Sequence, residues 1–164
     1  MITKKFNNFD AHGYLPKGIH DMTLEEIEET FSKTLIRQKI MAEYKTHLKD
    51  LMDTGYFMDH WIDGSFATSK ENPNDIDTLT EFDAIKIIEN DDKEKIDKLI
   101  KDAHSKSNEL CHSFKVYKYP PEDRDNYNRY INNKRRILIK LFGSDKEGIP
   151  KGIIHLVGGI EDAI

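Results

Sequence analysis

Hydrophobic residues recur along the chain at two spacings, one typical of helices and one typical of strands. The first helical pattern begins at Thr23, which forms a capping-box pair with Glu26, and keeps apolar residues every three or four positions. The same spacing continues from Ile36 to Met52 and stops at Gly55. We therefore predict two consecutive helices, or one bent helix, between Thr23 and Gly55.

Later segments alternate between strand-like and helix-like patterns. In chain order, the predicted elements are a strand at 56–62, a strand at 75–88, a helix from 91, a strand at 114–119, a helix at 122–142 and a short strand or packed tail at 152–157. Residues 1–22 carry glycines, a proline and aromatic rings, and we predict an irregular arm there. This order predicts one α+β domain over residues 1–164, in which helices pack on a small mixed sheet.

Composition narrows the class of protein. The chain has 164 residues, enough for one domain with a substantial core, and its 34% charged residues indicate a heavily solvated surface. No apolar run reaches the roughly 18 residues of a membrane span, and no apolar stretch follows the N-terminal lysines. We therefore expect a cytoplasmic protein that does not insert into membranes. Cys111, the single cysteine, excludes an intramolecular disulfide, and we expect it to be buried on a helix.

Charge is distributed unevenly along the chain. The net charge of −5 argues against a general nucleic-acid coat protein, because sequence-independent binding needs a dense basic face. Residues 115–140 differ from the rest, with eight basic and three acidic residues. This segment would face a polyanion such as RNA, or a nucleoside triphosphate. A solvated helix face explains the same charges equally well.

One motif has a spacing that specifies chemistry. Gly64 and Ser65 end an apolar run, and Asp75-Ile76-Asp77 follows after nine residues. In a strand, Asp75 and Asp77 project from the same face, where a divalent metal can bridge their carboxylates. A glycine followed by a serine lets backbone and hydroxyl approach a phosphate closely. Asp-x-Asp alone carries little information, since the chain contains it twice; the flanking strands and the Gly-Ser pair give it meaning.

These residues resemble the signature of the nucleotidyltransferase superfamily, which includes DNA polymerase beta, antibiotic nucleotidyltransferases and the minimal nucleotidyltransferases of toxin–antitoxin pairs. The signature is a hydrophobic residue, Gly-Ser or Gly-Gly, a short loop, then Asp-hydrophobic-Asp or Glu. The chain fits it except for Asp63 before the glycine. The wider sequence from Gly13 to Gly152 also looks like an uncharacterised bacterial and phage family of nucleotidyltransferase-like proteins.

The resemblance implies a nucleotidyltransferase-like fold and assigns roles to the motif. Gly64 and Ser65 would contact a nucleoside triphosphate, and Asp75 and Asp77 would be the catalytic ligands of Mg²⁺ or Mn²⁺. Lys70, in the loop between the two halves of the motif, would touch a phosphate or remain a solvated lysine.

The superfamily also places a third carboxylate on a later strand. The candidate strand is 114–119, and Lys115 occupies the expected position. A lysine there would pair with Asp75 and Asp77 and compete with a metal ion.

The sequence therefore leaves two functions open. One is Mg²⁺-dependent transfer of a nucleoside monophosphate from a triphosphate to a hydroxyl of a protein, an RNA or a small molecule. The other is a nucleotidyltransferase-like fold without turnover that binds a protein partner, as an antitoxin, an immunity factor or a phage inhibitor of a bacterial defence protein.

Overall fold

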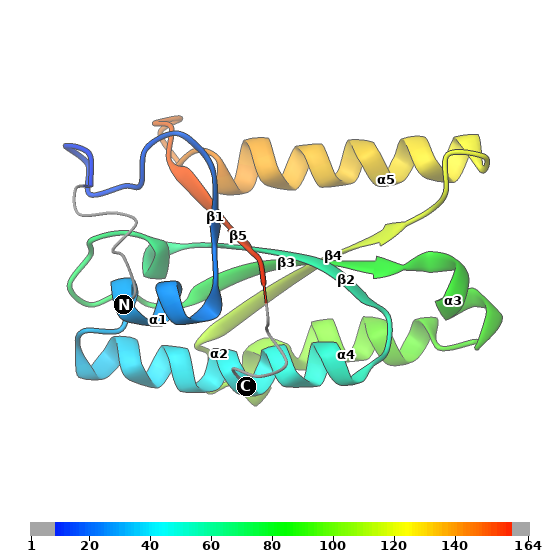
Figure 1. Cartoon of the computed structure of the whole chain (residues 1–164), viewed down its shortest axis with the longest axis horizontal. Coiled ribbons are helices and arrows are strands. Elements are labelled where there is room, and N and C mark those ends of the chain that lie inside the picture. The colour runs from blue at the N-terminus through cyan, green and yellow to red at the C-terminus, as the bar shows by residue number, and fades with distance from the viewer. Residues whose placement is uncertain (1–8, 159–164) are drawn as a thin grey trace.

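A mixed β-sheet lies at the centre of the computed structural model, which describes residues 9–158 (Figure 1). The strands are β1 (Gly18–Met22), β2 (Phe57–Asp63), β3 (Ile76–Asp83), β4 (Cys111–Lys118) and β5 (Gly152–Leu156). Within the described residues these five strands have the spatial order β1-β5-β2-β3-β4. β2 runs antiparallel to both β3 and β5, whereas β4 is parallel to β3 and β1 is parallel to β5.

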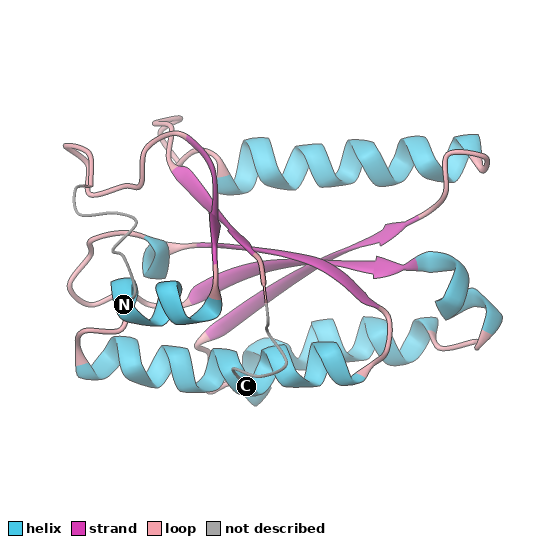
Figure 2. Cartoon of the chain, viewed as in Figure 1, coloured by secondary structure: helices cyan, strands magenta, loops and turns pink. Residues whose placement is uncertain are grey.

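Helices cover both faces of the sheet, so the predicted α+β class is confirmed. α2 (Leu35–Asp53) and α4 (Lys93–Lys106) lie on one side (Figure 1; Figure 2). α5 (Arg124–Arg136) lies on the other side and continues into a π-helical segment, η2 (Ile137–Phe142). The shorter α1 (Leu24–Phe31) precedes α2, and α3 (Ala84–Glu89) follows β3. Every helix within residues 9–158 is too short or too polar to span a lipid bilayer.

Alternation of side chains along the strands builds a core on each face of the sheet. Ile62 and Ile76 belong to a buried cluster with Ile40 and other apolar residues of α2. Trp61 and Leu79 project to the opposite face and pack with α5 and η2. This two-sided core follows from the period of two in strands, which sends neighbouring residues to opposite faces.

Two helices form between Thr23 and Gly55, as one of the two predicted alternatives. The Thr23 hydroxyl accepts a hydrogen bond from the Glu26 backbone, and the Glu26 carboxylate accepts one from the Thr23 backbone, so the capping box is confirmed. Thr34 then caps α2 by accepting a hydrogen bond from the backbone N–H of Arg37. A second N-cap inside the apolar pattern therefore separates the helices.

Two predicted boundaries in the middle of the chain are wrong. The strand predicted at 75–88 ends at Asp83, because the Asp83 carboxylate accepts a hydrogen bond from the Lys86 backbone at 3.2 Å and starts α3. Cys111 is buried as predicted, but it begins β4 instead of lying on a helix. Its backbone N–H donates to the Ser107 hydroxyl at 2.9 Å, which fixes the turn between α4 and β4.

The predicted irregular arm contains a strand. Residues 18–22 form β1, which pairs in parallel with β5 near the other end of the chain. A local pattern could not reveal this strand, because its hydrogen-bonding partner is distant in sequence. Residues 1–8 of the predicted arm lie outside the described residues.

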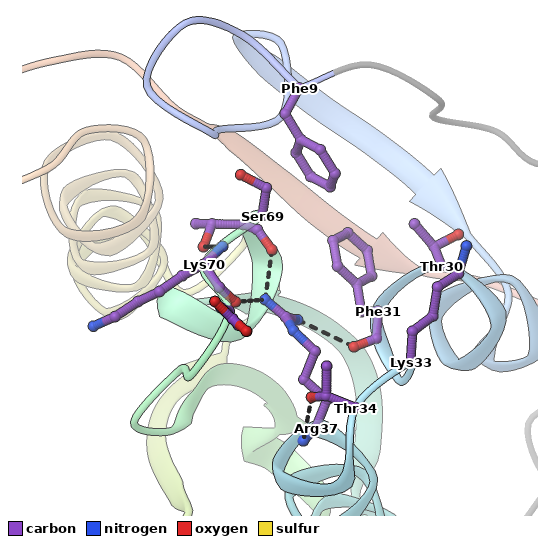
Figure 3. A pocket seen from close by; sticks show the side chains of 10 residues that line it. Phe9, Thr30, Phe31, Lys33, Thr34, Arg37, Ser69 and Lys70 are labelled. Atoms are coloured by element: carbon purple, nitrogen blue, oxygen red, sulfur yellow. Dashed lines mark hydrogen bonds between the residues drawn. The ribbon is translucent and has the colours of Figure 1, made fainter.

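A buried arginine fixes the loop between β2 and β3 against the helices. Arg37 is 6% exposed, and its guanidinium donates hydrogen bonds of 2.6 to 3.1 Å (Figure 3). The acceptors are the backbone carbonyls of Phe31, Phe66, Thr68 and Lys70. Burial lowers the pKa of Arg37, and within the described residues carbonyl dipoles, not a carboxylate, compensate its charge. Three loop carbonyls thus depend on one side chain.

We expect Arg37→Met to destabilise the protein by about 3 kcal/mol, because several buried carbonyls would lose a charged hydrogen-bond donor. Urea unfolding followed by circular dichroism measures this loss. The matched control is Lys39→Met on the same helix, at an exposed position, which should change stability by less than about 0.5 kcal/mol. A loss below about 1 kcal/mol for Arg37→Met would show that water replaces the guanidinium.

Candidate functional site

The two halves of the motif meet at one end of the β2–β3 pair. Asp63, the last residue of β2, lies opposite Asp77 on β3. Gly64 follows with a φ of +87°, a conformation that side chains disfavour. A Cβ atom at Gly64 would come within 3.0 Å of both the backbone nitrogen and Oδ2 of Asp77. Glycine is therefore required here both by its backbone conformation and by the close approach of Asp77.

The hydroxyl of Ser65 holds its own loop. It accepts a hydrogen bond of 3.0 Å from the backbone N–H of Asn74. The backbone N–H of Phe66 donates to the carbonyl of Asp75 at 3.3 Å, which closes the loop from the other side. Ser65 thus stabilises the loop between β2 and β3. Its contact with a phosphate stays a prediction.

Asp75 lies just before β3, which begins at Ile76, and its charge acts on Asp77. The pKa of Asp77 is raised to about 6, first by burial and second by the neighbouring charge of Asp75. The side chain of Asp77 is 27% exposed, so it remains accessible to a ligand. Two carboxylates that repel each other at a partly open site favour a cation that neutralises both.

Asp63 adds a third, buried carboxylate beside Asp77. It is 1% exposed, and burial raises its pKa to about 7 against the opposing effect of Lys151. Lys151 Nζ lies 2.9 Å from Asp63 Oδ2, a distance typical of an ion pair, although the contact lacks hydrogen-bond geometry. Oδ1 has no hydrogen-bond partner among the described residues. A buried carboxylate so poorly satisfied is common at functional sites and rare elsewhere.

His112 occupies the neighbouring position on β4, and the prediction for Lys115 is wrong. His112 lies opposite Asp77 in the parallel register, with Nδ1 3.7 Å from Asp77 Oδ1. Lys115 lies opposite Thr80, three residues farther along, and therefore points to the other face of the sheet. Its ammonium pairs with Asp97 of α4 at 3.1 Å. A lysine therefore does not compete at Asp77 from β4, and a histidine takes the neighbouring place.

Lys70 belongs to a different surface feature. It lines a pocket of about 390 Å³ together with Phe9, Phe31 and Arg37, and none of the motif's aspartates lines this pocket. Figure 3 shows the Lys70 ammonium pointing away from the rings of Phe9 and Phe31. The structure thus does not bring Lys70 together with Asp75 and Asp77, and its predicted phosphate contact stays a prediction.

The donor set suits a metal bound together with a phosphate. Within residues 9–158 there is no group of three or more His, Cys, Asp or Glu side chains arranged around a common metal position. Mg²⁺, however, is usually bound by one or two carboxylates, substrate phosphates and water. Asp75 and Asp77 could therefore hold Mg²⁺ or Mn²⁺ jointly with a triphosphate.

Sequence reasoning missed the residues that complete this site. Asp63 was visible only as a departure from the expected hydrophobic residue before Gly64. Lys151 and His112 carry no local signal, because the strand pairing brings them to Asp77 from distant segments. Arg37 also carries none, since its acceptors are backbone carbonyls of any residue type.

Fold and site together define an α+β protein with a carboxylate cluster at the end of its central antiparallel strand pair. A family model described as "Family of unknown function (DUF6932)" matches residues 7–157, and the chain belongs to this family. No curated protein and no solved structure gives a significant match. Function must therefore be argued from the residues themselves.

We expect Asp63→Asn to reduce the pH dependence of stability. The folded-state pKa of about 7 lies above the ordinary value of 3.8, so the folded protein keeps a proton that the unfolded chain loses. Stability contributed by this group is present at low pH and is lost as the pH rises from about 4 to 7. Each pKa unit corresponds to about 1.4 kcal/mol. The fall in the free energy of unfolding between low and neutral pH should therefore be about 2 to 4 kcal/mol smaller in the variant than in the wild-type protein.

Urea unfolding between pH 4.5 and pH 7.5 measures this dependence. Asp125→Asn, at an exposed position, is the control and should keep the slope of the wild-type protein. If Asp63→Asn also keeps that slope, Asp63 titrates as an ordinary carboxyl and the raised pKa is refuted.

Proposed function

We propose that the chain is a nucleotidyltransferase-like protein that binds a nucleoside triphosphate with Mg²⁺ at Asp75 and Asp77. The observation that carries the proposal is the close packing of Gly64 against Asp77 beside a second carboxylate, Asp75, which raises the pKa of Asp77. The pair is charged, partly exposed and held by backbone geometry. The resemblance of the Gly-Ser and Asp-x-Asp motif to nucleotidyltransferases supports the same conclusion.

The proposed reaction transfers a nucleoside monophosphate to a hydroxyl. The acceptor oxygen would bond to the α-phosphorus while the bond to the departing pyrophosphate breaks, and the hydroxyl proton would leave to water. A bound Mg²⁺ would supply charge neutralisation at the phosphoryl group. Asp75 and Asp77 would hold that ion, and Gly64 would let the backbone lie close to the phosphates. Lys151 would keep the buried Asp63 compensated.

One observation favours a second candidate. The residue beside Asp77 on β4 is His112, where the superfamily resemblance implies a carboxylate. A site with two metal-binding carboxylates and a histidine would bind a nucleotide without efficient turnover. The protein would then act by binding a partner protein, as an antitoxin, an immunity factor or an inhibitor of a defence protein.

We expect Asp77→Asn to lower the affinity for a nonhydrolysable triphosphate with Mg²⁺ at least tenfold, about 1.4 kcal/mol, because one metal ligand loses its charge. Isothermal titration calorimetry measures this affinity. Asp125→Asn, in the chain's other Asp-x-Asp sequence, is the matched control and should bind like the wild-type protein.

Incubation with labelled triphosphates, Mg²⁺ or Mn²⁺ and cell lysate separates the two candidates. Label transfer that depends on Asp77 supports the enzyme. Triphosphate binding without transfer supports the binding protein. If the wild-type protein binds neither metal nor triphosphate, the proposed enzyme and the proposed nucleotide-binding partner protein are both refuted.

A further inference from the structure

The exposed charges of α5 and η2 after the first helical turn are all basic. Residues 126–142 contain five basic residues and no acidic residue, although acidic residues outnumber basic ones in the chain as a whole. The basic residues are Arg129, Lys134, Arg135, Arg136 and Lys140. This segment lies in the longest stretch of the chain without Asp or Glu.

Only one of these cations serves the fold. Lys134 points toward the sheet, where its ammonium lies 2.8 Å from Glu81 and 4.6 Å from the centre of the Trp61 ring. The other four, Arg129, Arg135, Arg136 and Lys140, are exposed and form no ion pair within residues 9–158. Arg129, Arg136 and Lys140 follow one another at seven and four residues, so they share one face of the helix.

Asparagines lie among these cations. The side chains of Asn128, Asn132 and Asn133 are exposed and have no hydrogen-bond partner in the described part of the chain. Asparagine is a poor helix former, so three exposed asparagines on one helix weaken it without a compensating contact. Arginine and asparagine are among the side chains that donate hydrogen bonds to phosphates and base edges. This combination matches a nucleic acid better than an acidic protein.

Helix-dipole stabilisation explains part of the charge but not all of it. Cations in the last turn of a helix interact favourably with its C-terminal carbonyls, which accounts for Arg135 and Arg136. This effect falls off within one turn and does not reach Arg129. Arg129, Arg136 and Lys140 form a basic stripe, which we call the stripe below. From Arg129 to Lys140 it is about 16 Å long, which corresponds to about five nucleotide steps of 3.4 Å.

The inward side of η2 connects α5 to the candidate site. Phe142, at the end of η2, packs against Phe114 of β4 with ring centres 5.8 Å apart. Phe114 in turn lies 4.7 Å from the ring of His112, which is the neighbour of Asp77. Figure 1 shows α5 alone on its side of the sheet, with no other described element over its outward face.

We propose that the outward face of α5 and η2 binds the phosphate backbone of a nucleic acid and presents it to the carboxylate site. This inference rests on the proposed nucleotidyl transfer, whose acceptor would then be a hydroxyl of a nucleic acid. Charge complementarity carries the argument: four unpaired cations and three unpaired amides face solvent along one helix.

The test compares two triple variants with the same change in charge. Arg129→Gln/Arg136→Gln/Lys140→Gln removes the stripe, and Lys95→Gln/Lys101→Gln/Lys106→Gln removes three exposed lysines of α4 as the control. Fluorescence anisotropy measures binding of a labelled single-stranded RNA, a DNA of the same sequence, an RNA duplex and polyglutamate, at 50 and 200 mM salt. Thermal unfolding verifies that both variants remain folded.

We expect the wild-type protein to bind a nucleic acid and the α5 variant to bind it at least tenfold more weakly, with a shallower salt dependence. The α4 control should stay within about twofold of the wild-type affinity, since non-specific charge alone would affect both variants equally. The RNA and DNA arms identify the kind of nucleic acid. Equal loss in both variants, no nucleic-acid binding at 50 mM salt, or equally tight binding of polyglutamate would each overturn the proposal.

Triphosphate binding separates this inference from the proposed function. The α5 variant should keep the wild-type affinity for the triphosphate with Mg²⁺, and Asp77→Asn should not weaken the binding of nucleic acid measured without metal or triphosphate. If triphosphate binds normally but nucleic acid does not, only the α5 proposal fails. If nucleic acid binds but triphosphate does not, the proposed nucleotidyl transfer is refuted, and so is the role of the stripe in presenting an acceptor. The proposal that α5 and η2 bind a nucleic acid is then still supported.

Discussion

Asp63 lies opposite Asp77 because β2 and β3 pair antiparallel. The loop that joins these strands is fixed by hydrogen bonds from the buried Arg37 guanidinium. This pairing decides where the charges of the candidate site lie. It buries one carboxylate almost completely, leaves the other partly open, and requires a glycine between them. A buried carboxylate costs free energy unless a cation compensates it, and Lys151 reaches Asp63 from the segment before β5. This end of the central β2–β3 pair thus holds a buried carboxylate and the lysine that compensates it.

The polar side chains packed on the two faces of the sheet differ in charge. Toward α2, His47 and His60 are buried, and burial lowers their pKa values to about 4 and 3, so both are neutral and bond to hydroxyls. Toward α5, Glu81 accepts hydrogen bonds from Tyr130 and Lys134, both at 2.8 Å. His155 on the same face contacts Asp21 and Asp59; burial disfavours its charge, but these carboxylates outweigh burial and raise its pKa. Of these groups, those on the face that ends at Asp77 form ionic contacts, whereas the two buried histidines toward α2 are neutral.

The sequence was informative where structure depends on neighbouring residues. The capping box at Thr23 and the helical stripes follow from local spacing. It failed where structure depends on register. Sequence alone predicts Lys115 beside Asp77, whereas the β3–β4 register places His112 there. The same limit hid β1, whose partner is β5, and Lys151, whose partner is Asp63.

Electrostatics links the carboxylate site to the α5 surface. Besides burial, the charge of Asp77 raises the pKa of Asp63 and the charge of Asp75 raises the pKa of Asp77, and Lys151 is the cation paired with Asp63. A phosphate backbone held on the cations of α5 would be repelled from this cluster as long as the cluster keeps its negative charge. Occupation of Asp75 and Asp77 by a divalent cation would remove that repulsion. The metal would then promote binding of the acceptor near Asp77 as well as the transfer itself. Binding of the nucleic acid near Asp77 should therefore follow binding of the metal.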